Sequence, residues 1–225
     1  RLEYLVRVAV RMMDNVVDAS KFPLPEQDAE AKAKRRIGLG VTGLADALAL
    51  GGLVYGSGDA AAWTDKILRV IARTAYLTSV DLAKEKGAFP LFDADKYLSG
   101  ETFATHLPSD IKKQIRQHGL RNSHLLSIAP TGTISLAFAD NASNGIEPPF
   151  SWTYNRKKRM AVGDSKIYEV ADHAWRLYRH LGNDVSDDSK LPAAFVTALN
   201  MSANDHMMML QAAQPYVDSA ISKTV

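Results

Sequence analysis

A short loop in the middle of the chain combines residue types that bind anions. It lies in the segment SIAPTGTIS (residues 127–135), between two apolar runs. The proline ends a strand ladder, the glycine lets the backbone approach a ligand closely, and the hydroxyls donate hydrogen bonds. If a helix follows, its free N–H groups and its dipole favour a phosphate. The candidate anion-binding groups are Pro130, Gly132 and the hydroxyls of Thr131, Thr133 and Ser135. The loop lacks the lysine of a Walker A motif, and the same pattern is typical of an ordinary strand–helix turn.

A second glycine-rich segment, GLGVTG (residues 38–43), matches the G-x-G-x-x-G pattern. A dinucleotide-binding fingerprint requires a hydrophobic strand before the first glycine. Residues 29–36 are instead charged and helix-favouring, and Ile37 is the only apolar residue at the junction. The context therefore argues against a nicotinamide or flavin site, and we expect these glycines to permit close packing at a sharp turn.

Two further polar segments each allow a functional and a structural interpretation. Residues 141–149 (NASNGIEPP) surround Glu147 with turn-forming residues, as in an active-site loop or a well-ordered connector. Residues 155–159 (NRKKR) suit either a phosphate contact or a solvated surface.

Metal-binding patterns are weak in this sequence. Three histidines lie in helical stretches without the spacing of a ligand pair: His173, His180 and His206. The methionines at residues 207–209 are typical of core filling rather than of a soft-metal site. We therefore predict no metal site.

The chain contains no cysteine. This excludes disulfides, thiolate zinc sites, iron–sulfur clusters and a cysteine nucleophile within it. A thiol-free chain is compatible with a reducing compartment, and we expect a cytoplasmic protein.

Length and composition indicate a folded protein. The chain has 225 residues, 46% of them hydrophobic, and a formal net charge of +2. This excludes a disordered chain and allows one large core or two small ones. The basic residues are scattered among acids, which argues against nucleic acid as a partner. No apolar run approaches the roughly 20 residues of a membrane span, and no signal-peptide pattern opens the chain.

The elements that must position these loops follow from apolar spacing. It predicts helices over residues 2–17, 44–50, 59–86, 109–117, 164–181 and 202–213. Residues 124–129 (HLLSIA) are the clearest strand candidate. Long helices between sparse strands favour an α/β fold with parallel strands. The chain begins at Arg1 in mid-pattern, and residues 221–225 resemble the beginning of a strand. We expect a fragment; the alternative is a trimmed chain with a frayed terminal helix.

Five motifs together resemble the large catalytic chain of ribonucleotide reductases, in the order found in that family. They are MDNVVDASKFPLP (residues 13–25), RRIGLGVTGLADAL (35–48), SIAPTGTIS (127–135), NASNGIEPPF (141–150) and QPYVDSAISKTV (214–225). The resemblance spans the whole chain. The ending DSAISKTV is most similar to the adenosylcobalamin-dependent class II enzymes, with class I as the alternative.

The resemblance implies an α/β fold that is part of a ten-stranded α/β barrel made of two parallel halves around a finger loop. This chain, residues 1–225, would be a single incomplete domain, the C-terminal half of that barrel without the finger loop. The glycines at residues 38–43 would then form a barrel turn.

The resemblance also implies an activity. The family reduces the 2′-hydroxyl of ribonucleotides by radical chemistry that starts from a finger-loop cysteine. We expect a ribonucleoside diphosphate as substrate, with a triphosphate as the alternative, and adenosylcobalamin as cofactor. The expected partners are a thioredoxin-type reductant, which acts through C-terminal cysteines, and a second copy of the protein in a homodimer. We expect no DNA or membrane partner. The radical and redox cysteines lie outside this chain, so we expect no activity from it alone. The resemblance implies that the family's substrate phosphate site corresponds here to Pro130, Thr131, Gly132, Thr133 and Ile134, the candidate substrate-binding residues. A different class of function stays open: a non-catalytic phosphate-binding α/β module.

Overall fold

The computed structural model describes residues 1–158 and 165–224. The chain divides into two compact units. Unit 1 comprises Arg1–Gly40, Asp65–Ile128 and Ala213–Ile221. Unit 2 comprises Val41–Thr64, Ala129–Ala212 and Ser222–Val225, of which residues 159–164 and 225 lie outside the described part.

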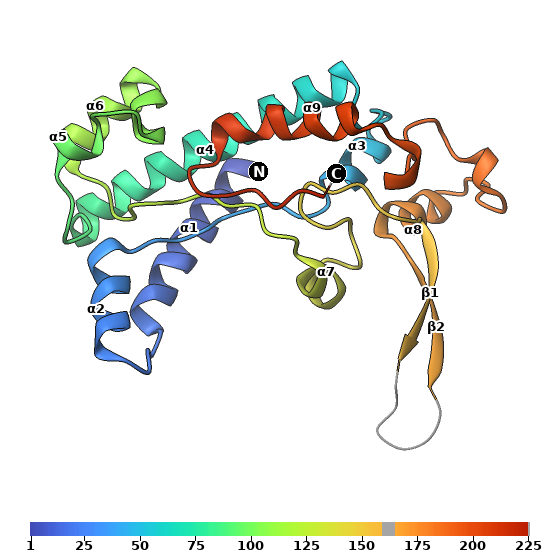
Figure 1. Cartoon of the computed structure of the whole chain (residues 1–225), viewed down its shortest axis with the longest axis horizontal. Helices are drawn as coiled ribbons and strands as arrows, with labels where there is room; N and C mark the ends of the chain where they lie inside the picture. Colours follow the sequence, from blue (N-terminus) through green and yellow to red (C-terminus); the bar gives the residue numbers. More distant parts are fainter. Residues whose placement is uncertain (159–164, 225) are drawn as a thin grey trace. The chain divides into compact units, whose positions relative to one another are not determined.

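Unit 1 is mainly helical (Figure 1). Its elements are α1 (Leu2–Ala19), α2 (Pro25–Lys34), most of α4 (Gly58–Lys86), α5 (Ala94–Tyr97), α6 (Ser109–His118) and the short 3-10 helices η1 (Phe103–His106) and η4 (Gln214–Tyr216). The sequence explains their ends. Helix α2 has Pro25 at its start, acids in its first turn and lysines in its last, which complement the helix dipole. Helix α4 ends before Gly87, whose φ of 84° is left-handed.

Residues 124–128 are the extended centre of unit 1. Leu126 forms a parallel bridge with Leu39, and Ile128 forms one with Ile221. The backbone hydrogen bonds include Leu39 N–H to Leu125 O (2.8 Å) and Ile128 N–H to Ala220 O (2.9 Å). The predicted extended segment with parallel neighbours is thus confirmed at these two positions, as isolated bridges rather than as long strands.

The glycines of the G-x-G-x-x-G segment pack closely against this centre. A Cβ added to Gly38 would lie 2.3 Å from Ser127 Oγ, and one added to Gly40 would lie 2.3 Å from the Ser127 carbonyl oxygen. The expectation of close packing is therefore confirmed for these two glycines.

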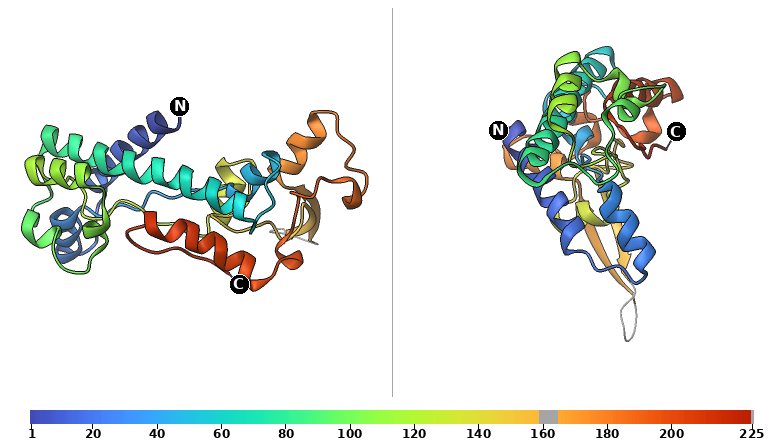
Figure 2. Two further views of the ribbon diagram at one scale, coloured as in Figure 1. Left: turned by 90° about the horizontal axis from the view of Figure 1, so that it is seen from above. Right: turned by 90° about the vertical axis from the view of Figure 1, so that its left-hand side faces the viewer.

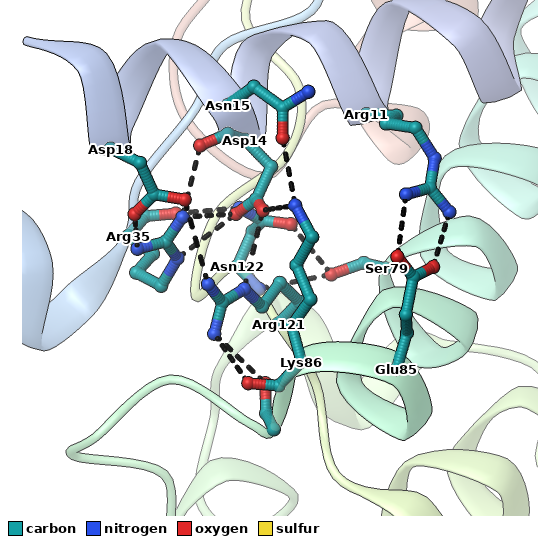
Figure 3. Close-up of polar contacts among 11 residues, drawn as sticks. Arg11, Asp14, Asn15, Asp18, Arg35, Ser79, Glu85, Lys86, Arg121 and Asn122 are labelled. Carbon is teal, nitrogen blue, oxygen red and sulfur yellow. Dashed lines mark hydrogen bonds and ion pairs between the residues drawn. The ribbon is translucent and has the colours of Figure 1, made fainter.

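A buried ion cluster ties α1 to other segments of unit 1 (Figure 3). At its centre, the fully buried carboxylate of Asp14 accepts hydrogen bonds from Arg35 Nη2 (2.8 Å) and Asn122 Nδ2 (3.0 Å). Arg121 Nε lies 3.3 Å from its second oxygen. Arg35, only 4% exposed, also donates to Asp18 at 2.7 Å. Since every buried charge has an opposite charge and hydrogen bonds, the cluster satisfies the requirements of a buried ion pair.

Unit 2 combines short helices with a two-stranded sheet. It contains α3 (Leu44–Leu50), the start of α4, α7 (Gly132–Phe138), β1 (Thr153–Lys158), β2 (Lys166–Ala171), α8 (His173–His180), α9 (Ala203–Ala213) and the 3-10 helices η2 (Asp188–Lys190) and η3 (Ala198–Asn200). Strands β1 and β2 are antiparallel, with Thr153 opposite Ala171, and form the two-stranded ribbon seen in Figure 1 and Figure 2. Helix α3 packs on α8. A small core of Ala49, Trp152, Ala174 and Phe195 lies in this unit.

The helix predicted over residues 164–181 is wrong in its first part. Residues Lys166–Ala171 form β2, and α8 begins only at His173. The β-favouring Ile167, Tyr168 and Val170 pair with β1, a long-range partner that helical spacing does not reveal. Asp172 ends the strand and caps α8, because its side chain accepts from Ala174 N–H at 2.9 Å. Asp164 lies outside the described residues.

The fold class is confirmed only in its coarse form. The described residues mix helix and strand, and their one sheet has two strands, so these residues do not by themselves form a ten-stranded barrel. The strand pair of that sheet is also antiparallel rather than parallel. None of the described helices is both long enough and apolar enough to cross a bilayer.

Candidate functional site

Unit 2 contains a cavity of about 830 Å³, a volume typical of small-molecule sites. Its wall includes Pro130, Gly132 and Thr133 from the predicted anion loop, whereas Thr131 and Ile134 are not among the lining residues. The second polar segment, residues 141–149, contributes all of its residues except Gly145 and Ile146, and Phe150 and Ser151 continue the wall. The structure therefore brings the two polar loops to one cavity.

Thr131 holds the two loops together. Its hydroxyl oxygen accepts from Gly145 N–H at 2.8 Å and lies 2.9 Å from Thr42 Oγ1. The Thr42 hydroxyl already donates to Ser143 O at 2.8 Å, so the Thr131 hydroxyl must be the donor to Thr42. Thr131 also has a φ of 60°, which is unusual for a β-branched residue. Its side chain thus fixes the loop rather than facing a ligand.

Thr133 is the exposed hydroxyl of the loop. It lies in the first turn of α7, whose cap is Thr131, and no hydrogen bond to its side chain occurs within residues 1–158 and 165–224. The neighbouring Ser135 is buried and donates its hydroxyl inward, to Gly132 O or Asn144 Oδ1, both at 3.0 Å. Thr133 is therefore the hydroxyl of this loop that is free to contact a ligand in the cavity.

Two buried aspartates lie at the cavity, Asp172 in its wall and Asp46 behind it. Asp46 accepts from Ser143 N–H (2.9 Å) and from Ala174 N–H (3.2 Å). Asp172 is 4% exposed and lines the cavity. Burial, together with repulsion from Asp46, raises the pKa of Asp172 to about 8. At neutral pH its carboxyl is therefore mostly protonated.

A second buried cluster joins the C-terminal segment to the loop. The Lys223 ammonium, with its side chain 2% exposed, donates to Glu147 Oε2 at 2.6 Å and to His206 Nδ1 at 2.7 Å. Glu147 also accepts from Thr224 N–H at 2.6 Å. Glu147, His206 and Thr224 line the cavity. The ion pair neutralises Glu147.

These two clusters decide the charge of the cavity wall. Its acids are Glu147 and Asp172, of which the first is paired with Lys223 and the second is mostly protonated. Arg156 of β1 also lines the cavity, and its guanidinium carries a permanent positive charge. The wall therefore favours an anionic ligand. Arg156 comes from the NRKKR segment, whose last residue, Arg159, lies outside the described part.

The histidines do not gather around a common point. His206 contacts Lys223, and His173 Nδ1 lies 2.9 Å from Asp140 Oδ2. In the part of the chain that the structure describes, no three His, Asp or Glu residues are arranged to hold a metal ion.

Sequence reasoning missed the residues that support the cavity from behind. Asp46 and Asp172 looked like ordinary helix residues, and Lys223 stood in a segment interpreted as the beginning of a strand. Lys223 and Glu147 are 76 residues apart, so no local pattern could pair them. The one available signal was the run of turn-forming residues around Glu147.

Comparison with known proteins identifies the family. The model of the ribonucleotide reductase barrel domain matches residues 1–225. A vitamin B12-dependent ribonucleoside-diphosphate reductase from Mycobacterium tuberculosis (strain CDC 1551 / Oshkosh) is 36% identical over 242 residues, covering 100% of this chain and 32% of that protein. A reductase of the same name from Thermoplasma acidophilum is 31% identical, covering 100% of this chain and 29% of that protein. A ribonucleoside-diphosphate reductase subunit alpha from Treponema pallidum is 33% identical over 70% of this chain and 19% of that protein.

The chain spans about a third of the length of the curated relatives that match all of it. The family match covers every motif discussed above, including both loops of the cavity. The chain belongs to the ribonucleotide reductase family, and its residues 1–225 match the model of that family's barrel domain.

Proposed function

We propose that this chain is the substrate phosphate-binding part of a ribonucleoside-diphosphate reductase. The observation that carries the proposal is the placement of the Pro-Thr-Gly-Thr-Ile loop. Three of its residues line an anion-favouring cavity of about 830 Å³ in a chain that matches the family over its whole length. The names of the relatives support a ribonucleoside diphosphate as substrate.

The proposed division of labour within residues 130–134 follows from the hydrogen bonds. Thr133 offers a free hydroxyl, and Gly132 leaves room for close approach, since a Cβ there would meet only Asn144 Nδ2, at 3.7 Å. Thr131 acts as a positioning residue through Thr42 and Gly145. Pro130 lines the wall, and Ile134 follows in the first turn of α7, where it is exposed and does not line the cavity. Holding the diphosphate here would fix the ribose, and a misplacement of about 1 Å can cost roughly 100-fold in rate.

The chemical step belongs to other parts of the protein. The chain has no cysteine, so the radical and reducing thiols expected of the family must be supplied by residues outside it. We assign this chain no catalytic residue.

Adenosylcobalamin is the proposed cofactor of the whole enzyme, because the relatives that align with the complete chain are named vitamin B12-dependent. The described residues do not fit it. The cavity is of a size typical for small ligands, and His206 and His173 each have a ring nitrogen engaged by a neighbouring side chain. We therefore assign the cofactor no residue in this chain.

The proposal extends to fold and partners. The barrel-domain match supports a ten-stranded α/β barrel in the whole protein, with residues 1–225 as a single incomplete domain of it. A thioredoxin-type reductant, a homodimer and a cytoplasmic location, without DNA or membrane partners, follow from the family assignment alone.

The test is a set of threonine variants in a full-length reductase that contains this segment. We expect Thr133→Val to raise the Kd for a ribonucleoside diphosphate by about 3- to 10-fold, the value of one lost hydrogen bond. The double variant Thr131→Val/Thr133→Val should lose more, because the loop is no longer held. Thr102→Val, at an exposed position of unit 1, is the matched control.

Unchanged affinity and turnover in the double variant would contradict the proposed site. Tight nucleotide binding without any deoxynucleotide product in the full-length protein would instead identify a non-catalytic phosphate-binding module.

A further inference from the structure

We propose that His206 is a neutral hydrogen-bond donor that contacts the ligand of the cavity through Nε2, and that Lys223 and Glu147 are the positioning residues that fix this state. The proposal rests on the proposed function for the identity of the ligand, a ribonucleoside diphosphate. The geometry of the three side chains carries the rest.

The side chain of Lys223 is almost completely buried. Its ammonium has three donors and no acceptor. All three have partners: Glu147 Oε2 at 2.6 Å, His206 Nδ1 at 2.7 Å and Thr224 O at 2.7 Å. A buried ammonium needs an anion, and the neighbouring Glu147 provides it.

This arrangement determines the tautomer of His206. Since Lys223 can only donate, Nδ1 of the imidazole must be the acceptor and cannot carry a proton. The single ring proton of the neutral imidazole then lies on Nε2. In a protonated imidazole, Nδ1 would carry a hydrogen that faces the Lys223 ammonium. Both groups would then be donors, and no hydrogen bond could form between them.

Nε2 is left free for a ligand. No hydrogen bond to it occurs within the described residues, and the only buried side-chain polar atom without a partner among those residues is Thr64 Oγ1. Nε2 is therefore not sealed in the core, and His206 is one of the residues that line the cavity.

The remaining neighbours of His206 leave Nε2 free. The ring of Tyr55 meets the imidazole edge to face, with centroids 6.3 Å apart, and its hydroxyl donates to Ile146 O at 2.5 Å. The Asp205 carboxylate accepts hydrogen bonds from the N–H and the hydroxyl of Ser202, both at 2.8 Å. Neither group holds Nε2.

A neutral N–H donor selects a hydrogen-bond acceptor rather than an anion as such. In a nucleoside diphosphate the candidate acceptors are phosphate and ribose oxygens. Thr133 lines the same cavity from another element, so His206 provides a second contact point that orients the ligand relative to the loop. Two separated contacts restrict rotation, which one hydrogen bond cannot do.

The test uses side chains that mimic one ring nitrogen at a time. In a full-length reductase, His206→Gln places an amide N–H near the position of Nε2, whereas His206→Asn reaches only the position of Nδ1. We expect His206→Ala and His206→Asn to raise the Kd for a ribonucleoside diphosphate by about 3- to 10-fold and His206→Gln to stay within about 2-fold. His180→Ala and His180→Asn, at an exposed α8 position away from the cavity, are the matched controls.

Two ligands distinguish the acceptor. A loss with the nucleoside diphosphate but not with inorganic pyrophosphate supports a ribose contact, and a loss with both supports a phosphate contact. Equal affinities of the wild type and His206→Ala for both ligands would overturn the inference. If Thr133→Val still weakens binding in that case, the proposed function survives; if it does not, the proposed function fails as well.

The positioning role has a spectroscopic test. With 15N-labelled histidine in the full-length protein, the His206 signal should show an unprotonated Nδ1 and a protonated Nε2 at neutral pH. The double variant Lys223→Met/Glu147→Gln removes both charges together, so no unpaired ion is left buried. We expect it to show a mixture of tautomers. A wild-type signal with protonated Nδ1 would refute the assignment.

Discussion

At the scale of single residues, burial decides whether an acid of unit 2 carries charge. Asp172 lies in the cavity wall with its pKa raised to about 8, because it is buried and close to Asp46. Its folded-state pKa is above its ordinary value near 3.8, so the folded protein binds this proton more tightly than the unfolded chain. The stabilisation is complete below pH 4 and is lost as pH rises through about 8.

Asp172→Asn should therefore become more stable relative to the wild type as pH increases. Asparagine is a good helix cap and keeps the acceptor for Ala174 N–H. We expect the difference in thermal midpoint between variant and wild type to grow from pH 4 to pH 8 and then level off. Thermal unfolding of the full-length protein at several pH values measures it.

Asp93→Asn is the matched control, because Asp93 also caps a helix but is solvent-exposed. Hydrogen bonding to Lys96 N–H lowers the pKa of Asp93, so this variant should not gain stability between pH 4 and pH 8. A pH-independent difference for Asp172→Asn would contradict the buried, protonated state.

The sequence predicted individual site residues only where chemistry is local. Pro130, Gly132 and Thr133 could be singled out because turn and hydroxyl residues adjoin a strand, and they line the cavity. The role of Thr131 could not be predicted, since it depends on Thr42, 89 residues away. Lys223 could not be paired with His206 for the same reason.

At the scale of elements, the buried cluster around Asp14 holds α1 in unit 1. Arg35, Arg121 and Asn122 all converge on this one carboxylate (Figure 3). The cluster contributes to stability because its charges neutralise one another. Removing one member leaves the remaining charges buried and unpaired.

Asp14→Ala should destabilise the protein by about 3–5 kcal/mol, since it leaves the buried Arg35 with only its partner Asp18. Chemical denaturation of the full-length protein checks the value. Arg11→Ala is the control on the same helix, because its ion pair with Glu85 is half exposed and should change stability little. If the two variants lowered the free energy of unfolding equally, burial would not explain the contribution of the cluster to stability.

Helices were predicted well where capping residues or glycines mark their ends in the sequence. Residues 44–50 form α3 as predicted, before Gly51 and Gly52. The helix predicted from residue 202 begins as α9 at Ala203, where Ser202 and Asp205 hydrogen-bond to each other. Strand β2 was mistaken for helix because its partner β1 is needed to fix it. Local signals therefore define helix ends, while strands depend on pairing that the sequence does not display.

At the scale of the whole molecule, the absence of cysteine limits what the chain can do. The purified chain of 225 residues should form no deoxynucleotide from a ribonucleoside diphosphate, even with added adenosylcobalamin and a dithiol reductant. The full-length reductase under the same conditions is the positive control. Product formation by the isolated, contaminant-free chain would contradict the proposed division of labour.

The pairing at the centre of unit 1 has a consequence for biosynthesis. The Asp218 carboxylate accepts from the N–H groups of Leu125 and Leu126, which precede it by 93 and 92 residues. Ile221 then bridges to Ile128. Such distant pairing forms slowly, because a long stretch of chain must be closed before any contact rewards it. On the ribosome, the side of residues 125–128 that pairs with the C-terminal segment stays open until Ile221 has emerged. The nascent chain therefore carries an open, aggregation-prone edge while the residues between Ile128 and Ile221 are synthesised, a period in which chaperones would protect it.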